Sequence, residues 1–390
     1  MSAEGSGGAW LEDLRQKAWE AYHDTPEPGR SAHLWRYTDP GLFRMPEQIL
    51  DAEPRPGLIV PEGDIPAGIE ILDLVEAAES RPELVRDRLG LAVRFDGGRL
   101  EALNLARFQH GLVVHAPRGL VAPSPLILIS RLGGKRFNAS RLLVVADEDA
   151  DLTLVRSYAA GTREGEIQSH CAIEVFAGPG SHVRLIVIQD LQPGARLHLA
   201  QRTVAERHAR VETVVVSLGG AVMKANVGTT LAGEGAESES WGVIVGDGTQ
   251  HFDHHTVHTH AAAHTQSRFN YKAVLKGHAR SVYTGSIRIE RDAPNCDAYQ
   301  ENRNLMLEET ARADSIPELE ILNQDVRCSH GATMGPIEPD YLFYLESRGI
   351  SHDDAVRLFV DGFVTPAFSR VPPAVEASLR GHLAARMERL

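Results

Sequence analysis

A dense histidine run is the first feature of this sequence that could carry chemistry. The segment HFDHHTVHTHAAAH holds six histidines. Side chains alternate along a strand, so a strand here would place His254, His258 and His260 on one face and His251 and His255 on the other. Three imidazoles on one face could ligate zinc or iron. The alternative is a polar strand face with hydrogen-bonded histidines, and the frequency of chance motif matches favours that alternative.

A second candidate is the pair Cys328 and His330 in the run DVRCSHGATMG. On a strand these two side chains would point the same way. A thiolate beside an imidazole suits a soft metal or an iron–sulfur intermediate, and a protonated histidine could lower the pKa of the thiol. The alternative is that Cys328 is a small buried apolar residue and that His330 is a turn residue before Gly331.

Motifs of common enzyme classes are missing from the sequence. No GxxxxGK[ST] run is present to hold a nucleotide phosphate, so the chain should not hydrolyse ATP itself. No GxSxG serine nucleophile motif is present either. Two enzyme alternatives stay open, a metal-dependent enzyme that uses the histidine run and a β-helix enzyme that acts on a polysaccharide. The second would need paired carboxylates, and no distinctive pair is visible.

The elements that would position these residues fall into three regions. Residues 1–98 predict an N-terminal helical region, with an amphipathic helix near Trp10 to Trp19, a proline-rich irregular stretch, and more helix around 69–90. Residues 99–335 contain short β-branched runs separated by turn residues at regular intervals, which fits a β-solenoid or a sandwich. Residues 336–390 predict helices again, with Ser351 as a possible cap. The fold class is mainly β, with helices at both ends.

Composition limits the partners of the chain. The 390 residues include 53 acidic and 40 basic residues, which give a formal net charge of −13. This charge disfavours nonspecific binding to nucleic acid or to anionic membranes. The sequence begins without the pattern of a secretion signal and has no apolar segment long enough to span a bilayer. Three cysteines, which are far apart in sequence, favour reduced thiols and a cytoplasmic location.

Several longer motifs after residue 250 carry a resemblance to a known family. In chain order they read QHFDHHTVHTH, YKAVLKGHARSVYTGSIRIERDA, AYQENRNLMLEETARADSIPELEI, DVRCSHGATMG and LFYLESRGI. They resemble the conserved core of the SufB/SufD family of iron–sulfur cluster assembly proteins. The resemblance implies a right-handed parallel β-helix between helical ends. It also implies that only part of the histidine run follows the family pattern.

Within the family, the CSHGAT and LFYLESRGI segments resemble the SufD branch. Residues 301–307 hold no cysteine, whereas SufB subunits are expected to carry one there. The resemblance therefore implies a scaffold subunit without its own enzymatic activity, which depends on a SufB paralogue for the main cysteine acceptor. His330 would take part in building the nascent cluster, with Cys328 as its neighbour. Cys296 lies where the family has none, and Asn323-Gln324-Asp325 departs from its usual pair of aspartates.

The resemblance also implies partners. The C-terminal helices would dock an ABC-type ATPase, SufC, in a complex of one SufB, two SufC and one SufD. The side chains expected to make this contact are Phe343, Tyr344, Leu345, Arg348, Phe359 and Phe363. An iron–sulfur cluster would be held transiently and shared with SufB, and no cofactor is expected on the isolated chain. The β-helix edge could also pair with itself, as a homodimer, when no partner is present.

Overall fold

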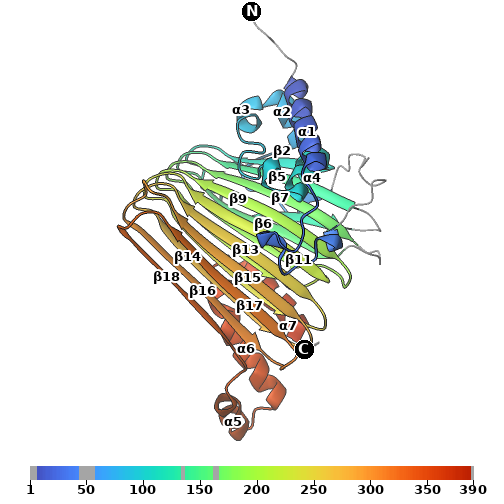
Figure 1. Ribbon diagram of the computed structural model, residues 1–390, viewed down its shortest axis with the longest axis vertical. Helices are drawn as coiled ribbons and strands as arrows, with labels where there is room; N and C mark the ends of the chain where they lie inside the picture. Colours follow the sequence, from blue (N-terminus) through green and yellow to red (C-terminus); the bar gives the residue numbers. More distant parts are fainter. Residues whose placement is uncertain (1–6, 44–57, 133–136, 161–166, 388–390) are drawn as a thin grey trace, which may run out of the picture.

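The computed structural model describes residues 7–43, 58–132, 137–160 and 167–387. In these parts the strands form two nine-stranded sheets (Figure 1). From β3 onward, successive strands along the chain belong alternately to the two sheets, so each turn contributes one strand to each sheet. The first sheet holds β1 (Ile59–Pro61), β4 (Leu126–Leu132), β6 (Asp151–Ala160), β8 (His182–Asp190), β10 (Arg210–Ser217), β12 (Glu237–Gly246), β14 (Gln266–Leu275), β16 (Cys296–Met306) and β18 (Val326–Gly335). The second holds β2 (Glu70–Asp73), β3 (His110–Ala116), β5 (Phe137–Ala146), β7 (Gln168–Ala177), β9 (Arg196–Ala205), β11 (Val222–Leu231), β13 (His251–His260), β15 (Arg280–Ile289) and β17 (Arg312–Ile321).

The architecture is a parallel β-solenoid, which confirms the predicted fold class. From β3 and β4 onward, neighbouring strands of each sheet pair in parallel, so that Val222, His251 and Arg280 stand at equivalent positions of three turns. Inward-facing aliphatic residues of the two sheets form a continuous core, to which Leu154, Val187 and Met223 belong. A short β-branched strand with a turn residue at each corner suits this stacking, because each turn buries its inner face only against its neighbours.

The corners of the solenoid explain several polar residues. Asp149, His208, His264 and Asn295 have φ between 55° and 59°, at the turns that follow one another along one side of the solenoid. Asn, Asp and His are the non-glycine residues that enter this left-handed region most readily. His264, the last histidine of the run, is therefore a turn residue.

Helices cover the outer faces of both sheets. The N-terminal helices are α1 (Gly7–Asp24), α2 (Leu74–Ser80), α3 (Pro82–Val85) and α4 (Arg99–Arg107), with the short helices η1 (His33–Trp35), η2 (Pro40–Phe43) and η4 (Phe95–Gly97). They pack on the second sheet through a cluster that includes Leu11, Leu103 and Leu143. At the other end of the chain are α5 (Pro339–Ser347), α6 (His352–Phe368) and α7 (Pro373–Met387). Among the described helices, none combines the length and the apolar character needed to cross a bilayer.

The C-terminal helices follow the sequence expectations closely. Ser351 caps α6 through its hydroxyl, which accepts the N–H of Asp354 at 3.2 Å. Helices α6 and α7 pack on the outer face of the first sheet, where Val364 and Leu379 meet Val214. By contrast, α5 projects beyond the sheets (Figure 1).

The N-terminal region departs from its prediction in one place. Residues 70–73 form strand β2, although helix was expected around 69–90, and the helix begins only after Asp73 caps α2 by accepting the N–H of Val75 at 2.9 Å. Pairing with β3 overrides the helical periodicity there. Both β1 and β2 join the sheets in antiparallel fashion and so cover the first strands of the solenoid. Residues 99–335 were expected to form the β-helix, but helix α4 occupies the start of this range.

Candidate functional site

The histidine run forms strand β13, and its histidines divide between the two faces as predicted. His254, His258 and His260 point into the solenoid, where each ring meets a hydroxyl group. The Nε2 atoms of His254 and His258 lie 3.0 Å from Ser217 Oγ and 3.1 Å from Ser238 Oγ. His260 contacts Thr265 Oγ1 and Ser267 Oγ, both at 2.8 Å. Each inner histidine thus has its own hydroxyl partner.

Burial makes these three rings neutral at physiological pH. It lowers the pKa of His254 and of His260 to about 4, and it holds the pKa of His258 well below the usual value. His258 also stacks on Phe269, with 3.9 Å between ring centroids. Among the described residues, no three His, Cys, Asp or Glu side chains are grouped so that they could hold a metal ion. The contacts therefore favour the hydrogen-bonded alternative over a zinc or iron site.

The outer face of β13 belongs to a buried ionic network. Asp253 accepts a hydrogen bond from Lys224 Nζ at 3.0 Å and another from the Thr38 hydroxyl. Burial pushes the pKa of Asp253 upward, but the hydrogen bond with His255 and the charge of Lys224 outweigh it and hold this pKa well below its ordinary range. His251 contacts the same Thr38 hydroxyl at 2.9 Å. These outer histidines therefore fasten the N-terminal segment to the solenoid.

Cys328 and His330 lie in β18, the last strand of the first sheet. They pair with Ala298 and Gln300 of β16, and Ala298 belongs to the inner core at this end. Both side chains thus point toward the space between the sheets, as the strand prediction required. His330 is exposed because, in the described part of the chain, no further turn covers it. Cys328 is half-buried against Ala298 and its neighbours.

The expected lowering of the thiol pKa by a neighbouring histidine is wrong. Burial, with a smaller contribution from the Asp297 carboxylate, raises the pKa of Cys328 to about 11. The thiolate would have to form in a partly apolar environment beside a negative charge, and both effects disfavour it. His330 is exposed and is therefore the more accessible of the two side chains.

Apolar side chains surround His330 at this end of the solenoid. We call this surface, formed by the last strands β17 and β18, the open end. Leu319 and Ile321 occupy inner positions of β17, in register with Ile287 and Ile289 of the turn below. Leu319 is 37% exposed and Met334 of β18 is 57% exposed. In the described residues, β17 and β18 each pair along one edge only, which leaves the other edges available for backbone hydrogen bonds.

The six residues expected to dock the ATPase fall into two groups. Phe343 and Tyr344 of α5 are exposed, with 71% of Phe343 accessible, while Leu345 is half-buried and Arg348 stacks over the Tyr344 ring at 5.2 Å. Phe359 and Phe363 of α6 instead pack against the cluster on the first sheet. The exposed aromatic surface belongs to α5.

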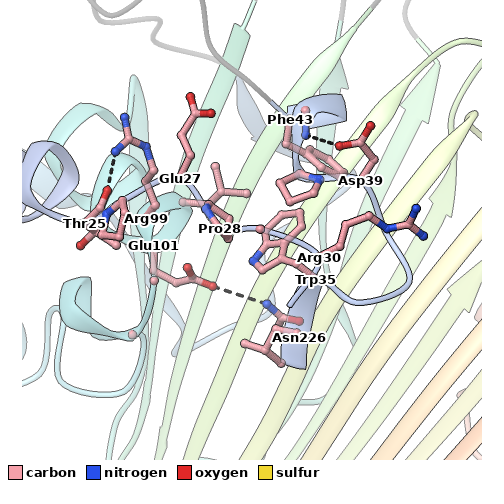
Figure 2. Close-up of a pocket in the computed structure, with 18 of the residues that line it drawn as sticks. Thr25, Glu27, Pro28, Arg30, Trp35, Asp39, Phe43, Arg99, Glu101 and Asn226 are labelled. Carbon is pink, nitrogen blue, oxygen red and sulfur yellow. Dashed lines mark hydrogen bonds between the residues drawn. The ribbon is translucent and has the colours of Figure 1, made fainter. Parts of the chain in front are cut away.

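A separate cavity lies on the N-terminal side, where sequence reasoning named no candidate residue. It has a volume of about 300 Å³ and is lined by Pro28, Trp35, Phe43, Arg99, Glu101 and Asn226, among others (Figure 2). Arg99 donates to the carbonyl of Thr25. Asn226 Nδ2 lies 3.5 Å from Glu101 Oε1. Figure 2 shows Pro28 and Trp35, from the segment after α1, gathered around the cavity with Arg99 and Glu101 of α4 and Asn226 of β11.

Comparisons with known proteins place the chain in a family. The family model described as SUF system FeS cluster assembly, SufBD core domain, matches residues 129–363, which include His330 and all six docking candidates. Iron–sulfur cluster assembly protein SufD of Bacillus subtilis is 26% identical, over 93% of this chain and 91% of its own length. Protein SufB of the same organism is 26% identical over 78% of this chain and 66% of its own length. A SufBD family protein of Synechocystis is 28% identical over 84% of this chain and 74% of its own length.

Proposed function

Because this chain belongs to the SufB/SufD family, we propose that it is the SufD-type scaffold subunit of an iron–sulfur cluster assembly complex and that it contributes one half of the cluster-building site. A role in cluster assembly follows from the family itself. The finer assignment rests on one observation, namely that His330 is exposed on the inner side of an uncapped solenoid end. The cluster is transient cargo here, and it is shared with the partner.

The proposed partner at the open end is a SufB-type paralogue. Two solenoids that meet at this end can join their unpaired strand edges by backbone hydrogen bonds and can bury Leu319, Ile321 and Met334. His330 would then face cysteine and acidic ligands supplied by the paralogue. Residues 301–307 offer no acceptor cysteine, so neither subunit alone would have a complete site. Without the paralogue, the same surface could pair with a second copy of this chain.

The α5 helix suits a second partner, which we propose to be the SufC-type ATPase. The chain has no phosphate-binding motif of its own, so any ATP hydrolysis belongs to that partner. ATP-driven movement of the ATPase could be transmitted through α6 and α7, which pack directly on the first sheet, and so reach the open end. All three cysteines are free, which suits a reducing cytoplasm.

The enzyme alternatives lack support among the described residues. The inner histidines are bonded to serine and threonine hydroxyls, and no metal-holding group is present there. The chain is therefore better explained as a scaffold than as a metal-dependent enzyme that uses the histidine run.

A charge placed at the open end should prevent pairing with the paralogue. Leu319→Asp puts a carboxylate at a position that the partner would cover, and burying an unpaired charge is costly. We expect the dissociation constant to rise at least about tenfold, which corresponds to about 1.4 kcal/mol. The isolated chain should stay folded, because Leu319 is already partly exposed. Analytical ultracentrifugation of the mixture measures this.

The matched control for Leu319→Asp is Val121→Asp. Val121 is also an exposed apolar residue, at 68%, but it lies at the opposite end of the solenoid beside Asp151. It should leave the affinity for the paralogue unchanged. If both variants weaken the affinity for the paralogue equally, or if neither variant weakens it, the open end is not the contact surface.

Removing the exposed aromatics of α5 should weaken binding of the ATPase. Aromatic anchors commonly contribute most of the binding free energy at an interface. For the double variant Phe343→Ala/Tyr344→Ala we expect at least about a tenfold loss of affinity by isothermal titration calorimetry. Its melting temperature should be unchanged, because both side chains are exposed.

Phe359→Ala serves as the comparison, because we expect it to change the melting temperature of the chain, which the α5 double variant should leave unchanged. Phe359 packs on the first-sheet cluster, so its loss should lower the melting temperature of the chain. If the α5 double variant binds the ATPase as tightly as the wild type, the docking role of α5 is wrong.

A further inference from the structure

Gln300 is a buried amide whose hydrogen bonds are missing. Its side chain is only 2% exposed, and neither Nε2 nor Oε1 has a partner among the described residues. A buried polar group left without a partner typically costs about 1–3 kcal/mol of stability. An amide that persists at such a position needs a reason.

The neighbours of Gln300 leave one direction for a partner. Gln300 stands between Phe269 of β14 and His330 of β18 in one inward-facing column. Phe269 is apolar and is covered by the ring of His258. Gly285 on the facing sheet offers no side chain, and a Cβ there would lie 2.6 Å from Gln300 Oε1. The polar side chain next in the column is His330, one strand spacing away, about 4.8 Å along the solenoid.

The other polar groups nearby have hydrogen-bond partners of their own and make no hydrogen bond to Gln300. The hydroxyl of Tyr283, which also borders Gly285, contacts Thr256 Oγ1 at 2.9 Å. Asn302, two residues along the same face of β16, is satisfied, because its Nδ2 donates to the Tyr271 carbonyl at 3.1 Å and its Oδ1 accepts from Asn304 at 2.8 Å. Gln300 thus differs from the other inner amides of its strand and lies directly under His330.

We propose that Gln300 is a positioning residue for His330, whose ring N–H it accepts through Oε1 while the other ring nitrogen binds iron of the nascent cluster. This inference rests on the function proposed above. An imidazole that ligates a metal through one nitrogen regularly donates its other N–H to a fixed acceptor, which sets the tautomer and the ring orientation. A neutral amide is an acceptor that keeps its hydrogen-bonding role across the physiological pH range.

Three variants of Gln300 and its neighbour test this in the assembled complex and in the isolated chain. Gln300→Met keeps the shape of the side chain but removes the acceptor, so iron binding and cluster yield in the complex should fall about tenfold. The melting temperature of the isolated chain should stay equal or rise, because an unsatisfied amide is removed. Gln300→Glu retains an acceptor oxygen and should restore most of the yield. Asn302→Leu, the matched control, should lower the melting temperature and leave the cluster yield per folded complex unchanged.

The outcomes separate this inference from the function on which it rests. If Gln300→Met builds clusters at the wild-type yield while His330→Ala does not, the positioning role is wrong and the proposed function stands. If His330→Ala also builds clusters normally, the proposed function itself fails. If Gln300→Met destabilises the isolated chain as Asn302→Leu does, or if Gln300→Glu fails to restore the yield, Gln300 is a structural residue and the inference is overturned.

Discussion

Replacing His330 by alanine should abolish cluster formation in the reconstituted complex while leaving the complex assembled. His330 is exposed at the open end, so its removal creates no cavity and should not disturb the fold. What is lost is an imidazole ligand for iron at the site that this chain shares with its partner. Anaerobic reconstitution followed by absorption spectroscopy measures the yield, and size-exclusion chromatography measures assembly.

The matched control for His330→Ala is Ser329→Ala. Ser329 is exposed in the same strand, but its side chain points to the opposite face of the sheet. This variant should assemble and should build clusters like the wild type. A normal yield from His330→Ala would remove the residue from the site, and failure of both variants would point to damage of strand β18 instead.

The second large expected effect is a loss of stability, and it comes from a substitution in β7, far from the open end. Glu174 of β7 is fully buried and ion-paired with the fully buried Arg141, at 2.7 Å. Its carboxylate also accepts the backbone N–H groups of Gly90, Ala92 and Val93, each at 3.0 Å. One side chain thus ties the segment before α4 to the outer face of the second sheet. Glu174→Gln leaves the guanidinium charge of Arg141 uncompensated, which should lower the free energy of unfolding by about 3–5 kcal/mol.

Urea unfolding of the isolated chain measures the effect of Glu174→Gln. The control is Asp13→Asn, which breaks the exposed pair of Asp13 and Lys17 on α1. Exposed pairs on a helix contribute little to stability, so the urea midpoint of this variant should hardly move. Adding Arg141→Met to Glu174→Gln should recover part of the loss, because the unpaired charge is gone. If the midpoint of urea unfolding shifts no more for Glu174→Gln than for Asp13→Asn, the stabilising role of the Arg141–Glu174 pair is wrong.

The mainly β fold class could be predicted because its signal is repeated along the chain, whereas the choice of a solenoid over a sandwich came from the family resemblance. Each turn repeats alternating apolar residues and corner residues such as Asp149 and His264, so local errors do not change the fold class. The faces of the histidine run could be predicted for the same reason, since alternation alone separates His254 from His255. The helices after residue 336 had clear caps and stops, among them Ser351 and Gly349.

Features that depend on which residues meet across turns could not be predicted. Arg141, Glu174 and Lys224 stand within largely apolar strand runs, and that placement is a usable signal of buried charge, but the sequence does not say that Arg141 pairs with Glu174 or Lys224 with Asp253. Strand β2 was missed because pairing with β3, a tertiary effect, decides its conformation.

The special position of Gln300 had no local signal. A single glutamine in a strand is unremarkable, and its relation to His330 depends on the register between β16 and β18. Likewise, the raised pKa of Cys328 depends on burial against Ala298 and on the charge of Asp297. The sequence spacing had suggested a lowered pKa for Cys328, because it placed only His330 beside the thiol.

The central claim is that this chain holds half of a cluster site, and counting iron and sulfide tests it most directly. Three samples would be reconstituted in parallel under anaerobic conditions: the isolated chain, its complex with the SufB-type and SufC-type partners, and the same complex built with His330→Ala. We expect stoichiometric iron and sulfide only in the wild-type complex. A stoichiometric cluster on the isolated chain, or an unchanged cluster content in the His330→Ala complex, would contradict it.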